Sequence, residues 1–390
     1  MQPRTEVIRI KVTRSDGSIL LSNNAQSIQV WTDSRHSANE VRNDFAAWFF
    51  LPIAMRTGKD LHVEGEGAEE TAKNARRLSE IWESWLPHHF SSVNISFDTH
   101  SPSRPRKSEK SLCFYSGGID STHALLTRHR AGQRQSLLTV HGLEYKLEDE
   151  SKFQAFKSKV SPFSSLVGTE HIFVRTDAYA TYNKCRVNLP AAHFSHIFAL
   201  AGSAFLYTEN YGDIFIAADY RRDQQFITHP WGSNSATNVY FDDGCTRLVT
   251  LDDHLTRTEK MPLILSSKEA LASVTFCTNN RSRPNNCGRC QKCTRTKLMF
   301  FVASGTVPEI FADPSIPSDW YSRFDLHKSY QRAFLLDIVT SAKRNSLFAH
   351  LPSADIVYAM LKKPNSASTR NDDVRRGFLD TLSHLMKRVR

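Results

Sequence analysis

The chain lacks any apolar run as long as the ~20 residues that a membrane-spanning helix requires. Its first residues also lack the apolar core of a secretory signal peptide, so we expect a cytoplasmic protein without a membrane partner. No internal repeat is recognisable. Hydrophobic residues make up 40% of the 390 residues and charged residues 23%, a balance that is typical of a globular protein and excludes a disordered one.

Cysteine is scarce, and the odd total of seven, together with the missing signal peptide, argues against a disulfide scaffold. Four of the seven follow the spacing C-x9-C-x2-C-x2-C, at Cys277, Cys287, Cys290 and Cys293. A short turn brings the sulfurs of a C-x2-C pair to one side, and four thiolates fill the tetrahedral coordination of Zn²⁺. We predict a structural zinc site here, with an iron–sulfur cluster as the alternative.

A Walker A loop is missing, because no lysine follows the glycine-rich stretch at residues 116–121, which reads Ser-Gly-Gly-Ile-Asp-Ser. An apolar run at residues 112–115 precedes this stretch and a helical pattern follows it, so we expect a strand, a tight turn and a helix start. The two glycines let the backbone turn its N–H groups toward one point, and the helix N-terminus adds a partial positive charge. The stretch predicts a cradle for a phosphate or pyrophosphate; an ordinary strand-to-helix turn is the alternative.

Strand and helix patterns alternate between residues 111 and 300. Alternation of this kind predicts an α/β domain whose parallel sheet carries helices on both faces. In such sheets, ligands bind beyond the carboxyl ends of the strands, which is where residues 116–121 would lie. We expect strands at residues 112–115, 137–140, 172–175 and 214–218, and helices at residues 151–160 and 190–210.

The flanking parts differ from this core. Residues 1–99 predict an α+β region with strands near residues 8–12, 28–30 and 93–97 and helices at residues 41–55 and 71–85; its Gly65 and Gly67 are interpreted as turn residues. Residues 100–110, with two prolines and several cations, predict a linker. Residues 301–390 predict a helical region, with apolar stripes at residues 330–342, 353–361 and 373–389.

The expected strand ends nominate further site residues. His141 and Gly142 end the second strand of the core, where adenine could lie against the backbone. Asp219 ends the fourth strand and could accept hydrogen bonds from the amidine edge of a guanine-like base. Arg221 or Arg222 could hold a substrate carboxylate, although a surface salt bridge is the alternative for any such Asp and Arg pair.

The stretch at residues 116–121 resembles the loop of the PP-loop ATP pyrophosphatase superfamily, whose members cleave ATP between the α and β phosphates. Combined with the four cysteines, it is similar to the 7-cyano-7-deazaguanine synthase family, and most of all to longer relatives from bacterial anti-phage operons. The resemblance covers residues 111–300. It implies an ATP-dependent ligase that forms AMP and pyrophosphate, uses ATP, Mg²⁺ and Zn²⁺, and converts a deazaguanine carboxylate into an amide or nitrile.

The resemblance also implies residue roles and partners. Asp120 and Ser121 would be catalytic, and a protein acceptor or operon partner could receive the deazaguanine group; a homodimer is also compatible with it. The sequence departs from the family at Ala192 and His193, where an Arg-Asn pair is expected, and at the end of the second strand, which leaves the product open. The residues expected to bind the nucleotide are Ser116, Gly117, Gly118, Asp120, Ser121, His141 and Gly142.

Two other functions stay open. A PP-loop enzyme that thiolates tRNA would need a reactive cysteine, and Cys185 lies between Lys184 and Arg186, which should lower its pKa. The second open function is that of a protein that binds ATP without turnover and contacts a partner. The net charge of +10 fits attraction of ATP and an anionic substrate, and it also fits nucleic-acid binding, which we do not favour.

Overall fold

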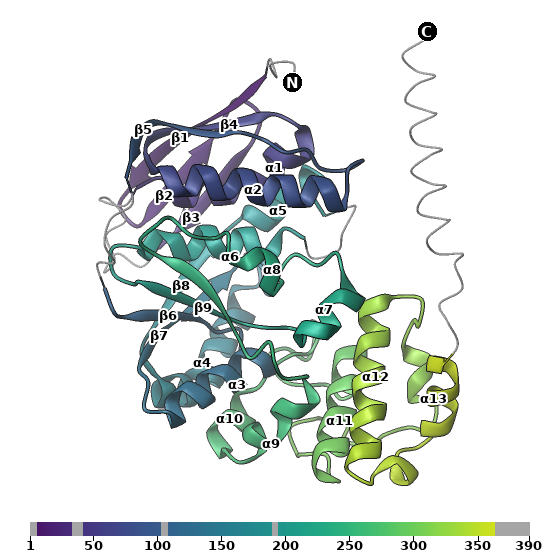
Figure 1. Ribbon diagram of the computed structural model, residues 1–390. Helices are drawn as coiled ribbons and strands as arrows, with labels where there is room; N and C mark the ends of the chain where they lie inside the picture. The colour runs from purple at the N-terminus through teal and green to yellow at the C-terminus, as the bar shows by residue number, and fades with distance from the viewer. Residues whose placement is uncertain (1–5, 33–41, 103–107, 189–193, 363–390) are drawn as a thin grey trace, which may run out of the picture.

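In a computed structural model of the chain, which describes residues 6–32, 42–102, 108–188 and 194–362, ten strands form one sheet (Figure 1). Their order across the sheet is β10 (Arg247–Leu251), β9 (Asp213–Ala217), β6 (Ser111–Phe114), β7 (Gln135–His141), β8 (Gly168–Thr176), β3 (Ser27–Trp31), β2 (Ser18–Ser22), β1 (Val7–Ser15), β4 (Asp60–Ala68) and β5 (Ile95–Ser101).

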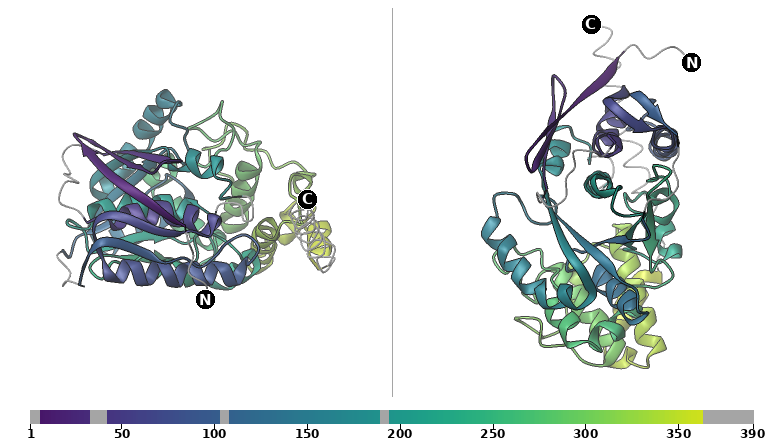
Figure 2. Two further views of the ribbon diagram at one scale, coloured as in Figure 1. Left: turned by 90° about the horizontal axis from the view of Figure 1, so that it is seen from above. Right: turned by 90° about the vertical axis from the view of Figure 1, so that its left-hand side faces the viewer.

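Within the group from β10 to β8, each strand is parallel to the next. Every residue of β6 and β7 is buried, as expected of strands covered on both faces. Side chains of β6 alternate between two apolar cores: Leu112 and Phe114 join one, whereas Cys113 joins the other. The predicted α/β fold with helices on both faces is therefore confirmed (Figure 2), while its assignment to the PP-loop fold stays a prediction.

One core is covered by helices α1 (Asp44–Thr57), α2 (Glu69–Trp85) and α6 (His196–Ala204), and the other by helices that include α3 (Ile119–Arg130) and α4 (Glu150–Val167). The predicted inward side of α4 is confirmed, because Phe153, Phe156 and Val160 are buried. The predicted helix at residues 190–210 is shorter in its described part, where α6 passes into a 3-10 turn, η2 (Phe205–Tyr207). Residues 189–193, with Ala192 and His193, lie outside the described residues.

The N-terminal strands continue the sheet of the core. Val30 and Trp31 of β3 pair antiparallel with Thr176 and Arg175 of β8. The described part of residues 1–99 contains both strands and helices, but its strands share one sheet with the core, and α1 packs against α6. The domain boundaries at residues 99, 110 and 300 stay predictions, and residues 103–107 of the expected linker lie outside the described chain.

The interpretation of Gly65 and Gly67 as turn residues is wrong, because both lie inside β4. At Gly67, a Cβ atom would stand 2.3 Å from the ring of Phe97 on β5, so only glycine fits this close approach. The ladder between β4 and β5 shifts register between Val63 and Glu66, and the Gly65 N–H turns away to donate to Asp98 at 2.6 Å. Strands β2, β4 and β10 have no counterpart among the expected strands.

Helices α11 (Gln291–Ser304), α12 (Ser329–Arg344) and α13 (Ala354–Lys362) confirm the helical character of the C-terminal region. They pack at the end of the molecule farthest from β1, β4 and β5 (Figure 1). Residues 363–390, with the helix expected at 373–389, lie outside the described residues. Across the described part of the chain, no helix combines the length and the apolar character needed to cross a bilayer.

The contact between α1 and α6 is tight enough to test. A Cβ atom at Gly202 of α6 would lie 2.5 Å from the ring of Phe49 on α1. We expect Gly202→Leu to lower the free energy of unfolding by about 1–3 kcal/mol, because the ring is fully buried and has no room to move. Urea denaturation followed by circular dichroism measures the change. Ala359→Leu, at an exposed position of α13, is the control and should change it little.

Candidate functional site

Residues 116–121 form the predicted strand, turn and helix start between β6 and α3. Gly117 takes the left-handed conformation, with φ of 69°, and a Cβ atom there would lie 2.7 Å from Thr275 Cγ2. Its carbonyl accepts a 2.8 Å hydrogen bond from the Thr275 N–H, which ties the turn to the chain leading into the cysteines. The Ser116 and Ser121 hydroxyls lie 3.3 Å apart, and the Gly118 N–H donates to Ser116 Oγ at 3.3 Å.

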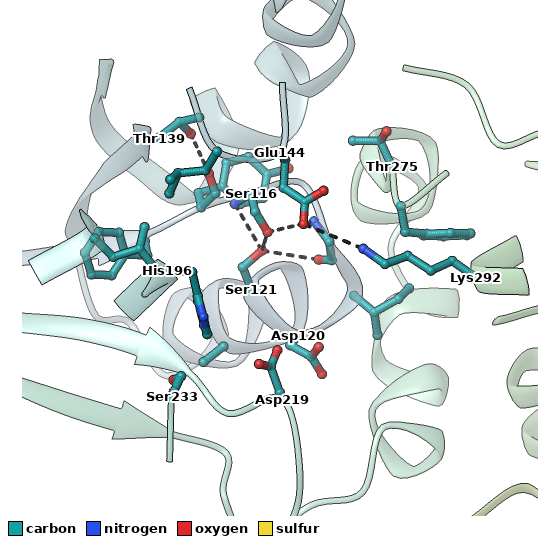
Figure 3. A pocket seen from close by; sticks show the side chains of 18 of the residues that line it. Ser116, Asp120, Ser121, Thr139, Glu144, His196, Asp219, Ser233, Thr275 and Lys292 are labelled. Atoms are coloured by element: carbon teal, nitrogen blue, oxygen red, sulfur yellow. Dashed lines mark hydrogen bonds and ion pairs between the residues drawn. The ribbon is translucent and has the colours of Figure 1, made fainter. Parts of the chain in front are cut away.

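This turn opens into a cavity of about 470 Å³ at the carboxyl ends of β6, β7 and β9 (Figure 3). A cavity of this size at this edge of a parallel sheet is where nucleotide-sized ligands bind. Its wall combines serines, aromatic rings and charged groups from distant parts of the chain. The turn contributes Ser116, Gly118, Ile119, Asp120 and Ser121, and the rest of the wall includes Thr139, Glu144, His196, Asp219, Trp231, Arg257, Arg283, Lys292, Arg295, Tyr330 and Phe334.

Gly117, His141 and Gly142 do not line this cavity. His141 is buried, stacks on Phe153 with ring centroids 3.9 Å apart, and has a pKa that burial lowers. Gly142 has φ of 113°, and a Cβ atom there would lie 1.9 Å from the Thr176 carbonyl oxygen, so it is required for packing. Val140 and Leu143, on either side of this pair, line the cavity instead.

Asp120 is held by two cations from a distant segment. Its carboxylate accepts hydrogen bonds from Arg257 Nε at 3.2 Å and from Lys260 Nζ at 2.9 Å. The Lys260 ammonium is fully buried and also donates to the Ala218 carbonyl at 2.7 Å. Burial alone would raise the pKa of Asp120, but the charges of Arg257 and Lys260 outweigh it and lower the pKa to about 2. Asp120 is therefore a structural anion and not a free acid or base.

Asp219 lines the cavity as expected, but Arg221 and Arg222 do not. The Asp219 carboxylate accepts a 3.1 Å hydrogen bond from Trp231 Nε1 and lies 3.7 Å from the Arg257 guanidinium. Arg221 pairs with Asp223 at 2.6 Å, and Arg222 pairs with Asp253 at 2.8 Å. Both arginines thus form the surface salt bridges that were the alternative interpretation, and other cations face the ligand space.

Four cations missed by the sequence reasoning line the cavity: Arg257, Arg283, Lys292 and Arg295. Lys292 and Arg295 flank the last cysteine of the cluster. This position beside the cysteine motif is the sequence feature from which their place in the cavity wall could have been predicted. Lys292 lies 3.6 Å and Arg283 3.1 Å from the carboxylate of Glu144. No sequence pattern marks Arg257, which follows β10, a strand that was not predicted.

The four predicted metal ligands come together. The sulfur atoms of Cys277, Cys287, Cys290 and Cys293 all lie within 4.8 Å of one another. Two of the pairs, Cys277 with Cys290 and Cys287 with Cys293, are 3.8 and 3.9 Å apart. Two thiolates of a tetrahedral zinc with bonds of about 2.3 Å stand about 3.8 Å apart. The cluster could therefore bind a metal such as zinc, and four sulfurs would leave no coordination position for water.

Backbone amides surround these sulfurs and stabilise negative charge on them. Cys287 Sγ accepts from the N–H groups of Arg289 and Cys290 at 3.3 and 3.2 Å. Cys277 Sγ accepts from the Asn279 N–H at 3.4 Å. Cys277 also lines the cavity, and its carbonyl accepts a 2.6 Å hydrogen bond from Arg283 Nε. The cysteine cluster therefore supports one wall of the candidate site.

Cys185 does not fit the role of a reactive thiol. It follows α5 (Ala178–Lys184) and does not line the cavity. The expectation of a lowered pKa is wrong: burial raises the pKa of the Cys185 thiol, and the opposing charge of Lys184 is too weak to reverse this. Cys113 is a core residue, as its strand position indicates, and burial raises its pKa to about 12.

Comparisons of the chain with protein-family models, with curated proteins and with solved structures found no match. The interpretation of the site rests on its own residues. The features that carry weight are a serine and glycine turn at a helix start, a cavity beside it, an excess of cations around that cavity and a four-cysteine cluster in its wall.

The cysteine cluster makes a prediction for the purified protein. We expect about one zinc ion per chain, measured by inductively coupled plasma mass spectrometry, and its loss in Cys290→Ser together with a lower melting temperature. Cys185→Ser is the matched control, because this thiol lies outside the cluster, and it should keep the metal. Absorbance near 400 nm with bound iron would instead indicate an iron–sulfur cluster and contradict the zinc assignment.

The ion pairs of Asp120 make a prediction for stability. Asp120→Asn leaves two largely buried cations without their anion, so we expect the free energy of unfolding to fall by about 3–5 kcal/mol in guanidinium chloride at pH 7. Because the folded-state pKa lies near 2, below the unfolded value of about 3.9, this contribution is present above pH 4 and is lost as the pH falls toward 2. An unchanged difference between the two proteins at pH 2 and pH 7 would contradict this.

Proposed function

We propose that this protein is an ATP-dependent ligase that adenylates the carboxylate of a deazaguanine-type acid and releases pyrophosphate. The product would be an amide, a nitrile or a conjugate with a protein acceptor, in the manner of the longer relatives of 7-cyano-7-deazaguanine synthase from anti-phage operons. The observation that carries the proposal is the turn at residues 116–121, which opens at a helix start into a cavity of a size typical of nucleotide-sized ligands.

The turn supports binding of the pyrophosphate part of ATP. Ser116 is exposed to the cavity, and Ser121 lies in the first turn of α3, where the helix dipole favours an anion. The Gly118 N–H, which now donates to Ser116 Oγ, could turn to a phosphate oxygen with little motion. The roles we assign to Ser116, Gly118 and Ser121 are direct contacts with phosphate, whereas Gly117 shapes the turn.

The proposed reaction has two steps. A carboxylate oxygen of the acid attacks the α phosphorus, the bond to the β,γ-pyrophosphate breaks, and an acyl adenylate forms. Ammonia or another amine then attacks the acyl carbon, AMP leaves with its electron pair, and the nitrogen loses a proton to give an amide. The protein would act mainly by holding the reactants together and by stabilising the charge that develops on phosphate.

Asp120 is a poor candidate for a magnesium ligand, because Arg257 and Lys260 already occupy its oxygens. Asp219 is better placed: its carboxylate faces the cavity beside Asp120 (Figure 3) and remains partly exposed. Mg²⁺ commonly binds through one or two carboxylates plus phosphate oxygens, and it would neutralise the leaving pyrophosphate. We therefore assign Asp120 the positioning of Arg257 and Lys260, in place of a role in chemistry.

The tRNA-thiolation alternative loses its support at Cys185, which lies outside the cavity and has a raised pKa. Binding of ATP without turnover remains the competing function, and the cavity alone does not separate it from catalysis. The release of AMP distinguishes the two.

The test is incubation of the purified protein with Mg-ATP, ammonia and 7-carboxy-7-deazaguanine, followed by mass spectrometry of nucleotides and products. We expect AMP, pyrophosphate and an amide or nitrile. Asp120→Ala would be a poor negative control, because it removes a buried ion pair and destabilises the fold. Ser116→Asp is sharper: a carboxylate at this exposed position repels phosphate, and ATP affinity should fall on the order of 10-fold or more.

Ser161→Asp, at an exposed position of α4 away from the cavity, adds the same charge and should leave ATP affinity and AMP release unchanged. Binding of ATP without AMP release, with any of the tested acids, would overturn the ligase proposal in favour of a nucleotide-binding protein. Equal loss of ATP affinity in the Ser116 and Ser161 variants would show that the turn is not the phosphate site.

A further inference from the structure

Among the described cations that line the cavity wall, Arg295 is the one without a carboxylate within ion-pair distance, and the charges of Asp120 and Asp219 reach it only from farther away. It lies on α11, two residues beyond Cys293, and its guanidinium makes no ion pair or hydrogen bond with any other described residue. Its Nε atom is buried without an acceptor.

The other cations around the cavity differ from Arg295 in this respect. Two of them share the carboxylate of Asp120, and two share the carboxylate of Glu144. A partly buried cation without an ion-pair partner is unfavourable in the free protein, because its desolvation is not fully repaid by a counter-charge. A negatively charged ligand oxygen in the cavity would supply the missing partner through a charge-assisted hydrogen bond.

Aromatic rings fix the Arg295 guanidinium and line the space beside it. Its Cζ atom lies 3.8 Å from the ring centroid of Phe334 on α12, and Tyr220 stacks on Phe334 with centroids 4.9 Å apart. The rings of Trp231 and Tyr330, 6.2 Å apart, line the same cavity. Flat apolar walls around one fixed cation favour a planar ligand that carries a negative charge.

We propose that Arg295, with Phe334, Trp231 and Tyr330, forms a subsite that binds the carboxylate of a planar aromatic acid. This subsite rests on the proposed function, for which it selects the acid substrate. Arg295 holds the carboxylate, and the aromatic walls hold the ring. The same guanidinium chemistry could instead serve a phosphate of ATP, so the experiment separates the two anions.

The subsite also gives the C-terminal helices a role. Phe334 and Tyr330 both come from α12, which lies outside the part of the chain that resembles the PP-loop enzymes. The N-terminal half of α12 therefore belongs to the wall of the ligand cavity, and it shares the selection of the acid with Arg295 and Trp231.

The test measures binding by isothermal titration calorimetry, without turnover. The probes are 7-carboxy-7-deazaguanine and indole-3-carboxylate, each with its neutral amide, and ATP. In the wild-type protein we expect at least one acid to bind more tightly than its amide. Arg295→Met should weaken that acid about 10- to 100-fold, the range expected for loss of a hydrogen bond to a charged group, and leave the amide unchanged. Arg295→Lys should restore part of the loss.

Two further readouts keep the result interpretable. Arg295→Met should melt at the same temperature as the wild type or higher, since it removes a partly buried charge that has no ion-pair partner, so a loss of binding cannot be ascribed to unfolding. Arg344→Met, which removes an arginine at the far end of α12 that pairs with Glu259, is the matched control and should leave acid binding unchanged.

The outcomes separate the subsite from the proposed function. Loss of acid affinity in Arg295→Met with ATP affinity retained supports the subsite. This conclusion does not depend on turnover: a wild-type protein that never releases AMP would overturn the ligase proposal and leave the subsite intact. A fall in ATP affinity with acid affinity retained would assign Arg295 to a phosphate and overturn the subsite. Failure of both acids to bind the wild-type protein would overturn it as well.

Discussion

The pairing of one buried carboxylate with two cations holds the candidate site together. Asp120 belongs to the turn at residues 116–121 and lies in the first turn of α3, whereas Arg257 and Lys260 follow β10. Lys260 also binds the carbonyl of Ala218 at the end of β9. Between the two cations, Thr258 donates through its N–H and its hydroxyl to Asp337 of α12. One network of hydrogen bonds and ion pairs thus fixes the turn at residues 116–121, the ends of β9 and β10, and helix α12 relative to one another.

This arrangement explains which parts of the site the sequence could predict. The turn at residues 116–121 and the C-x2-C spacings are local patterns, in which a few neighbouring residues determine the geometry, and the structure places both as expected. The partners of Asp120 are 137 and 140 residues away, so no local pattern announces them. Arg221 and Arg222 were nominated because they follow a strand, but neighbouring carboxylates hold them at the surface.

The same distinction applies to the fold. The buried strands of the core were predicted from continuous apolar runs, and the helices from their amphipathic spacing. Three strands were missed: β2 and β10, which mix apolar and polar residues, and β4, whose glycines and charged side chains were taken for a turn. At Gly67, glycine was taken as a sign of a turn, although its actual reason is the ring of Phe97 on the neighbouring strand. Neither the pairing of β3 with β8 nor the resulting single sheet leaves a trace in local sequence.

The spread of the cavity wall along the chain has a consequence for synthesis of the protein. The turn at residues 116–121 leaves the ribosome more than 200 residues before Phe334, which forms another part of the cavity wall. Between them, the chain must deliver Arg257, Lys260 and all four cysteines before the apolar rings of the cavity are enclosed. A nascent or truncated chain that ends before α12 would carry the turn beside an open, hydrophobic trough, so such chains are the natural targets of chaperones and proteases.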